Sequence, residues 1–169
     1  GSSSCIGGLH VGYIPAAFEE EGSTDVDRDA LDAMRQLNVE LVEVGLAELP
    51  YMSLMNVVYA EAAAAFEELT LNNREDELVW QAKGAWPNIF RKARFLSEVD
   101  HVQLDRLRYQ TMQVMDEVFS KVDMMIGPCM GPMLVINNFT GHPCLHLRAR
   151  FCKTKPRVED SLGTPQYNT

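Results

Sequence analysis

The stretch that decides the fold is residues 9–46, LHVGYIPAAFEEEGSTDVDRDALDAMRQLNVELVEVGL. Residues 9–14 predict a short strand, because they are mostly β-favouring side chains and Pro15 stops the run. Ser23 and Thr24 are good helix caps, and the aspartates that follow them favour the positive end of a helix dipole. A helix therefore begins at about residue 25.

Apolar side chains then recur at helical spacing until Asn38, namely Val26, Ala30, Leu31, Met34 and Leu37. Residues 39–46 are rich in Val and Leu and predict a second strand. A strand, a short helix and a strand in this order form a β-α-β unit, in which the two strands run parallel.

Three helical regions follow, and each carries an apolar stripe or aromatic side chains: residues 52–69, 75–95 and 97–121. Pro87 interrupts or restarts the middle one. We expect the last two strands of the sheet at Asp123–Cys129 and Cys144–Leu147. The expected fold is α/β, with a mixed, mainly parallel sheet flanked by long helices. One domain is expected over residues 1–151, and residues 152–169 predict a loop or tail.

The segment Met124–Leu147 contains no Asp, Glu, Lys or Arg, which raises the question of a membrane span. Two Gly-Pro pairs and an Asn-Asn pair interrupt it, and a helix exposed to lipid does not satisfy its backbone through such breaks. We therefore interpret this segment as two buried strands with an irregular loop between them, in the densest part of the core.

The chain has 169 residues and a net charge of −9, with 15 basic and 24 acidic side chains. This length is typical of one domain. An acidic chain is repelled by nucleic-acid phosphates and anionic lipid, so we expect no nucleic-acid and no membrane partner. The acidic side chains gather in residues 1–82, which we interpret mainly as a solvated helix face.

The four cysteines, Cys5, Cys129, Cys144 and Cys152, form no C-x-x-C pair. No secretory signal pattern opens the chain, so we expect reduced cysteines and a cytoplasmic location.

The serines and cysteines give only weak signs of a nucleophile. The opening Gly1–Ser4 lacks the preceding strand of a phosphate loop, and Ser120 and Lys121 are helix neighbours that do not face each other. Cys129 lies in a Gly/Pro-rich turn and could pair with His142, although a buried structural cysteine is the simpler interpretation.

His142, Cys144 and His146 alternate, so on a strand they would share one face, with Cys129 nearby as a fourth zinc ligand. Successive ligands on one strand face are about 7 Å apart, too far for three of them to reach one ion. We therefore expect no metal and no cofactor.

Three stretches occur in the order and rough spacing of a known family: LHVGYIP at residues 9–15, VDMMIGP at 122–128 and NFTGHPC at 138–144. Together they resemble the amidase signature family, the Ser–cis-Ser–Lys hydrolases that include fatty-acid amide hydrolases and allophanate hydrolases. The resemblance covers about residues 6–151.

The resemblance implies a hydrolase of C–N bonds in linear amides. It also implies that the chain is an internal portion of such an enzyme, because the family's Ser–cis-Ser–Lys residues have no counterpart in the matched stretches. The chain would then supply part of the sheet and of the substrate cleft without being catalytic alone. The cleft residues expected from it are Pro128, Cys129, Asn138, Thr140 and Gly141.

Two alternatives stay open. The chain could be a non-enzymatic interaction module that uses its acidic face or an open sheet edge, or a Cys-His hydrolase that uses Cys129 and His142. Because a partial sheet leaves an unpaired edge, we also expect either a homo-oligomer or a partner that supplies the remainder of an amidase.

Overall fold

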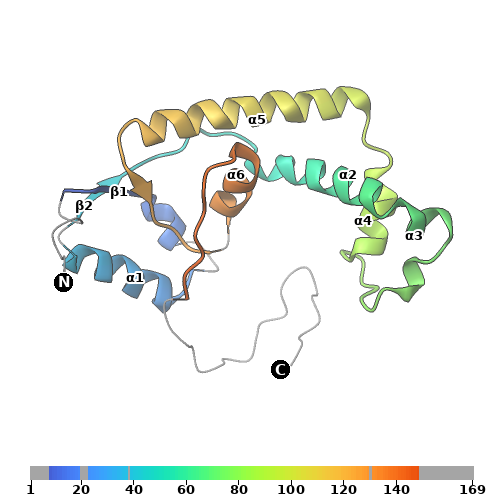
Figure 1. Ribbon diagram of the computed structural model, residues 1–169, viewed down its shortest axis with the longest axis horizontal. Coiled ribbons are helices and arrows are strands. Elements are labelled where there is room, and N and C mark those ends of the chain that lie inside the picture. Colours follow the sequence, from blue (N-terminus) through green and yellow to red (C-terminus); the bar gives the residue numbers. More distant parts are fainter. Residues whose placement is uncertain (1–7, 20–22, 38, 130, 149–169) are drawn as a thin grey trace. The chain divides into compact units, whose positions relative to one another are not determined.

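The computed structural model describes residues 8–19, 23–37, 39–129 and 131–148, which form two compact units (Figure 1). The first unit contains the described residues up to Met52 and from Leu107 onward, and the second contains Ser53–Arg106. The predictions for Gly1–Ser4, Cys5 and residues 152–169 lie outside the described residues.

The first unit contains a three-stranded parallel sheet of order β2-β1-β3. Its strands are β1 (His10–Tyr13), β2 (Glu40–Glu43) and β3 (Met124–Met125). Helix α1 (Asp25–Gln36) connects β1 to β2, and Val11 pairs with Leu41 of β2 and with Met124 of β3. The predicted β-α-β unit is confirmed, and the described part of the chain has an α/β fold.

The start of α1 follows from its sequence. Thr24 caps the helix, and Asp27 accepts hydrogen bonds from the Thr24 backbone and hydroxyl, both at 2.7 Å. Arg28 pairs with Asp25, and Arg35 pairs with Asp32, each three residues apart on the helix. Much of the acidic charge of α1 is therefore engaged within the helix itself.

Helices lie on both faces of the sheet in this unit (Figure 1). On one face Val44 packs against Val118 and Val122, at and just after the end of α5 (Glu98–Phe119). A Cβ added to Gly12 of β1 would lie on the same face, 3.1 Å from a Val122 methyl group. Val11, the neighbouring residue of β1, lies on the other face and is fully buried.

A second core cluster joins Tyr51, Met115 of α5 and Ile136 of α6 (Pro132–Thr140). The prediction of two buried strands over Met124–Leu147 is wrong for most of this segment. Pro132 occupies the first helical turn, and Gly141 ends the helix in the left-handed conformation at φ +77°. Both residues are helix-boundary signals, and they prevail over the strand preference of Val135 and Ile136.

After α6 the chain has no regular structure up to residue 148, so the strand predicted for Cys144–Leu147 is also wrong. Leu145 is 79% exposed and Leu147 is 78% exposed, which excludes them from the core. Among the described residues, no helix combines the length and apolar character needed to cross a bilayer.

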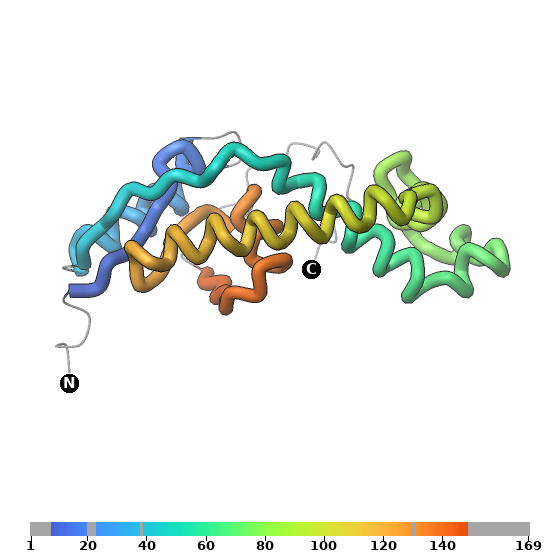
Figure 2. The backbone as a smooth tube through the Cα atoms, turned by 90° about the horizontal axis from the view of Figure 1, so that it is seen from above, coloured from blue at the N-terminus to red at the C-terminus, as the bar shows by residue number. Residues whose placement is uncertain are grey.

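The second unit is helical. Its elements are the end of a 3₁₀ turn η2 (Tyr51–Leu54), α2 (Met55–Ala65), α3 (Glu67–Leu71), η3 (Glu75–Glu77), α4 (Trp86–Ala93) and the first turns of α5. The helix predicted over residues 52–69 is interrupted at Phe66, and Pro87 lies in the first turn of α4. Figure 2 shows α5 as one uninterrupted helix.

Aromatic rings and an ion pair with a buried carboxylate hold α4 against its neighbours in the second unit. Phe90 of α4 stacks on Phe66, with ring centroids 5.6 Å apart. The Glu75 carboxylate is almost fully buried, and Arg91 Nε lies 3.2 Å from it. A buried carboxylate needs such a partner, because its desolvation is costly.

Candidate functional site

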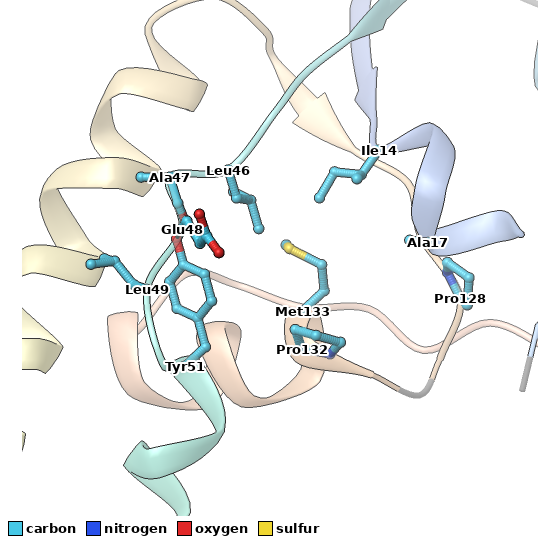
Figure 3. A pocket seen from close by; sticks show the side chains of 10 residues that line it. All are labelled: Ile14, Ala17, Leu46, Ala47, Glu48, Leu49, Tyr51, Pro128, Pro132 and Met133. Atoms are coloured by element: carbon cyan, nitrogen blue, oxygen red, sulfur yellow. Dashed lines mark hydrogen bonds between the residues drawn. The ribbon is translucent and has the colours of Figure 1, made fainter. Parts of the chain in front are cut away.

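A cavity of about 320 Å³ lies in the first unit, beside the carboxyl ends of the three strands (Figure 3). Ile14 directly follows β1, the loop 46–51 follows β2, and Pro128 follows β3. Ala17 of η1 (Pro15–Phe18) and the first turn of α6 complete the lining. In open parallel sheets, ligands bind at this edge, and the volume suits a small molecule.

Most of the lining is aliphatic: Ile14, Ala17, Leu46, Ala47, Leu49, Pro128, Pro132 and Met133. The Tyr51 hydroxyl is already engaged, because it donates a 2.6 Å hydrogen bond to the Ala47 carbonyl oxygen. Burial raises the pKa of Tyr51, so this side chain stays neutral. The remaining polar side chain is Glu48, which is exposed and faces the aliphatic lining residues in Figure 3.

Four of the residues expected to form a cleft fall into two places. Pro128 lines the cavity. Asn138 and Thr140 donate hydrogen bonds to the carbonyl oxygens of Leu134 and Ile136, one helical turn back in α6, and Gly141 caps that helix. These three residues form the carboxyl-terminal turn of α6, and they are not among the residues that line the cavity.

Cys129 is exposed, and its sulfur lies 3.4 Å from Nδ1 of His146. His142, the histidine expected beside this thiol, lies elsewhere: its ring stacks on Phe119 and its Nδ1 lies 2.8 Å from the Thr140 hydroxyl. His142 is thus part of the packing at the end of α6. Cys129 is therefore not buried as expected, and the histidine that its sulfur contacts is His146.

His10 lies at the opposite, amino-terminal edge of the sheet, between carboxylates of both neighbouring segments. Its ring nitrogens lie 3.4 Å from Glu40 and 3.4 Å from Asp123. Its backbone N–H donates a 2.8 Å hydrogen bond to Asp123, which is the main reason that the pKa of Asp123 is lowered. These contacts tie the first residues of the strands together.

The described serine hydroxyls with hydrogen bonds use nearby oxygens as acceptors. Ser23 donates to the Phe18 carbonyl, Ser97 to the Asp100 carboxylate and Ser120 to the Glu117 carbonyl. In the part of the chain that the structure describes, no three His, Cys, Asp or Glu side chains are arranged to hold a metal ion.

Sequence reasoning missed most of the cavity wall, in particular the loop from Leu46 to Tyr51 and the start of α6 at Met133. The signal was present, because a loop that directly follows a predicted parallel strand lies at the edge where ligands bind. Comparison with protein-family models and with curated protein sequences gave no match.

Proposed function

We propose that the chain is part of an amidase of the signature family, and that its cavity holds the apolar portion of a linear amide. The proposal is supported by the three ordered stretches that resemble this family and, above all, by the aliphatic cavity at the carboxyl ends of the parallel strands. The matched stretches carry no Ser–cis-Ser–Lys set, so the role proposed for this chain is substrate binding.

The wall of the cavity suits an amide better than the acid that its hydrolysis releases. The Glu48 carboxylate accepts hydrogen bonds, and a primary amide offers two N–H donors. A carboxylate product offers none at neutral pH and carries the same charge as Glu48. At about 4 Å in a solvated site this repulsion is about 1 kcal/mol, or roughly fivefold in affinity.

Hexanamide is a suitable probe. Burial of its five-carbon chain contributes about 4 kcal/mol at roughly 0.8 kcal/mol per methylene, which corresponds to a Kd of about 1 mM. We expect it to shift the methyl NMR signals of Ile14, Leu46 and Met133, with hexanoate binding about fivefold more weakly. Glu48→Gln should remove most of that difference, because the repulsion is lost.

Two neighbouring alanines provide a matched pair of control variants. Ala17 lines the cavity and Ala16 does not, although both lie in η1. Ala17→Phe should abolish binding by filling the space, and Ala16→Phe should leave the affinity unchanged. If hexanamide shifts no signals, or shifts them equally in both variants, the proposed role of the cavity is wrong. Release of ammonia by the purified chain would show that it cleaves amides itself.

A further inference from the structure

One imidazole ring lies between two thiols in the first unit. The sulfur of Cys129 lies 3.4 Å from Nδ1 of His146, and the sulfur of Cys144 lies 3.6 Å from Nε2 of the same ring. Both cysteines are free and exposed. The two ring nitrogens point in opposite directions, so this arrangement does not place both on one metal ion.

The contacts around Cys144 suit one tautomer of the His146 ring. The amide nitrogen of Asn137 lies 3.5 Å from the Cys144 sulfur, and this nitrogen acts only as a donor. In the tautomer that carries its proton on Nε2, His146 donates to the Cys144 sulfur and leaves the lone pair on Nδ1 facing the Cys129 thiol. A nucleophile, a base within reach and a third group that orients the base are the pattern of an activated thiol.

We propose that Cys129, His146 and Cys144 form a peroxide-reactive dithiol site, in which hydroperoxides are the substrate class. His146 Nδ1 takes the Cys129 proton while the sulfur attacks the outer peroxide oxygen. The S–O bond forms, the O–O bond breaks, and the leaving oxygen takes the proton as water or an alcohol. The sulfur is oxidised to sulfenic acid by two electrons, and the peroxide is reduced.

Cys144 completes the reaction as the resolving thiol. Its sulfur attacks the sulfenic sulfur of Cys129, an S–S bond forms, the S–O bond breaks, and the hydroxyl leaves as water with the Cys144 proton. The His146 ring must leave the space between the sulfurs for this step. Its segment permits the movement, because the described residues after α6 have no regular structure and the His146 side chain is exposed.

The test treats the full reduced chain with hydrogen peroxide, in a background with Cys5→Ser and Cys152→Ser. Peptide mass spectrometry should find a Cys129–Cys144 disulfide. His146→Gln should slow its formation about a hundredfold, which is the low end of what a positioned base contributes. His142→Gln is the matched control and should react at the unchanged rate, because its ring contacts Thr140 and Phe119.

Two further measurements show whether His146 acts as a base or only supports the local structure. In Cys144→Ser, a 1,3-dione reagent should trap sulfenic acid at Cys129. Above about pH 9.5, where an ordinary thiol ionises without help, the His146→Gln variant should approach the wild-type rate of Cys129 oxidation. Absence of the disulfide, or equal rates for His146→Gln and wild type at neutral pH, would overturn the proposal. These readouts involve no amide ligand, so they are independent of the proposed function.

Discussion

Replacing Ile136 with alanine tests whether α6 forms part of the wall that supports the cavity. Ile136 is fully buried and packs in one cluster with Met115 of α5 and with Tyr51, which lines the cavity. The substitution removes three carbon atoms and adds no polar group. If Ile136 packs as the structure places it, the first unit should lose stability without changing its fold.

The expected loss is about 3 kcal/mol. Three carbons at roughly 0.8 kcal/mol each give about 2.4 kcal/mol of transfer free energy. The space left behind adds about 24 cal/mol per Å3 that the neighbours do not fill, and Ile→Ala changes in cores cost about 2–5 kcal/mol in total. Leu145→Ala is the matched control, because Leu145 is 79% exposed and its loss should cost less than about 0.5 kcal/mol.

Amide hydrogen exchange is the appropriate assay, because both tryptophans, Trp80 and Trp86, lie in the second unit and would report on that unit. The Val44 N–H donates to the Tyr13 carbonyl across the β1–β2 pair, so its exchange measures opening of the first unit. We expect its opening free energy to fall by about 3 kcal/mol in Ile136→Ala. A fall no larger than that of Leu145→Ala would refute the placement of α6.

Two further predictions concern the sheet. Gly12→Ala should cost about 1–3 kcal/mol of stability in a urea titration, because the new Cβ would lie 3.1 Å from Val122. Gly45→Ala is the control and should cost far less, because a Cβ at that position has no atom within 4 Å. The pKa of Asp123 is lower in the folded chain than in the unfolded chain. Its contribution to the free energy of unfolding is therefore fully present above the unfolded pKa of about 3.9, and it is lost as the pH falls through the pKa of the folded state. Asp123→Asn should therefore reduce stability at pH 6, and the difference from wild type should shrink toward pH 3; a difference independent of pH would contradict this.

The β-α-β unit was predictable because its signals are local. Thr24 and the aspartates after it define the start of α1, and the alternation between a strand pattern and a helix pattern defines the order of elements. The closing segment was harder. Val135, Ile136 and Phe139 favour a strand by composition, and burial against α5 selects a helix once Pro132 and Gly141 set its ends.

The candidate sites depended on distances that sequence patterns do not encode. The spacing of Cys129, His142 and His146 allowed either histidine to approach the thiol. The helical α6 decides between them, because it ties His142 to Thr140 in its last turn and leaves His146 in the following irregular segment. The cavity likewise forms only where three loops from distant parts of the chain meet.

The middle position of β1 has a consequence for how the chain folds during synthesis. His10 at the start of β1 is bonded to Asp123, 113 residues later in the sequence. At roughly 5–20 residues per second, the ribosome leaves β1 without its second neighbour for about 6–23 s. During that interval the edge of β1 that β3 later covers is exposed, so this is the stage at which chaperone protection should matter most.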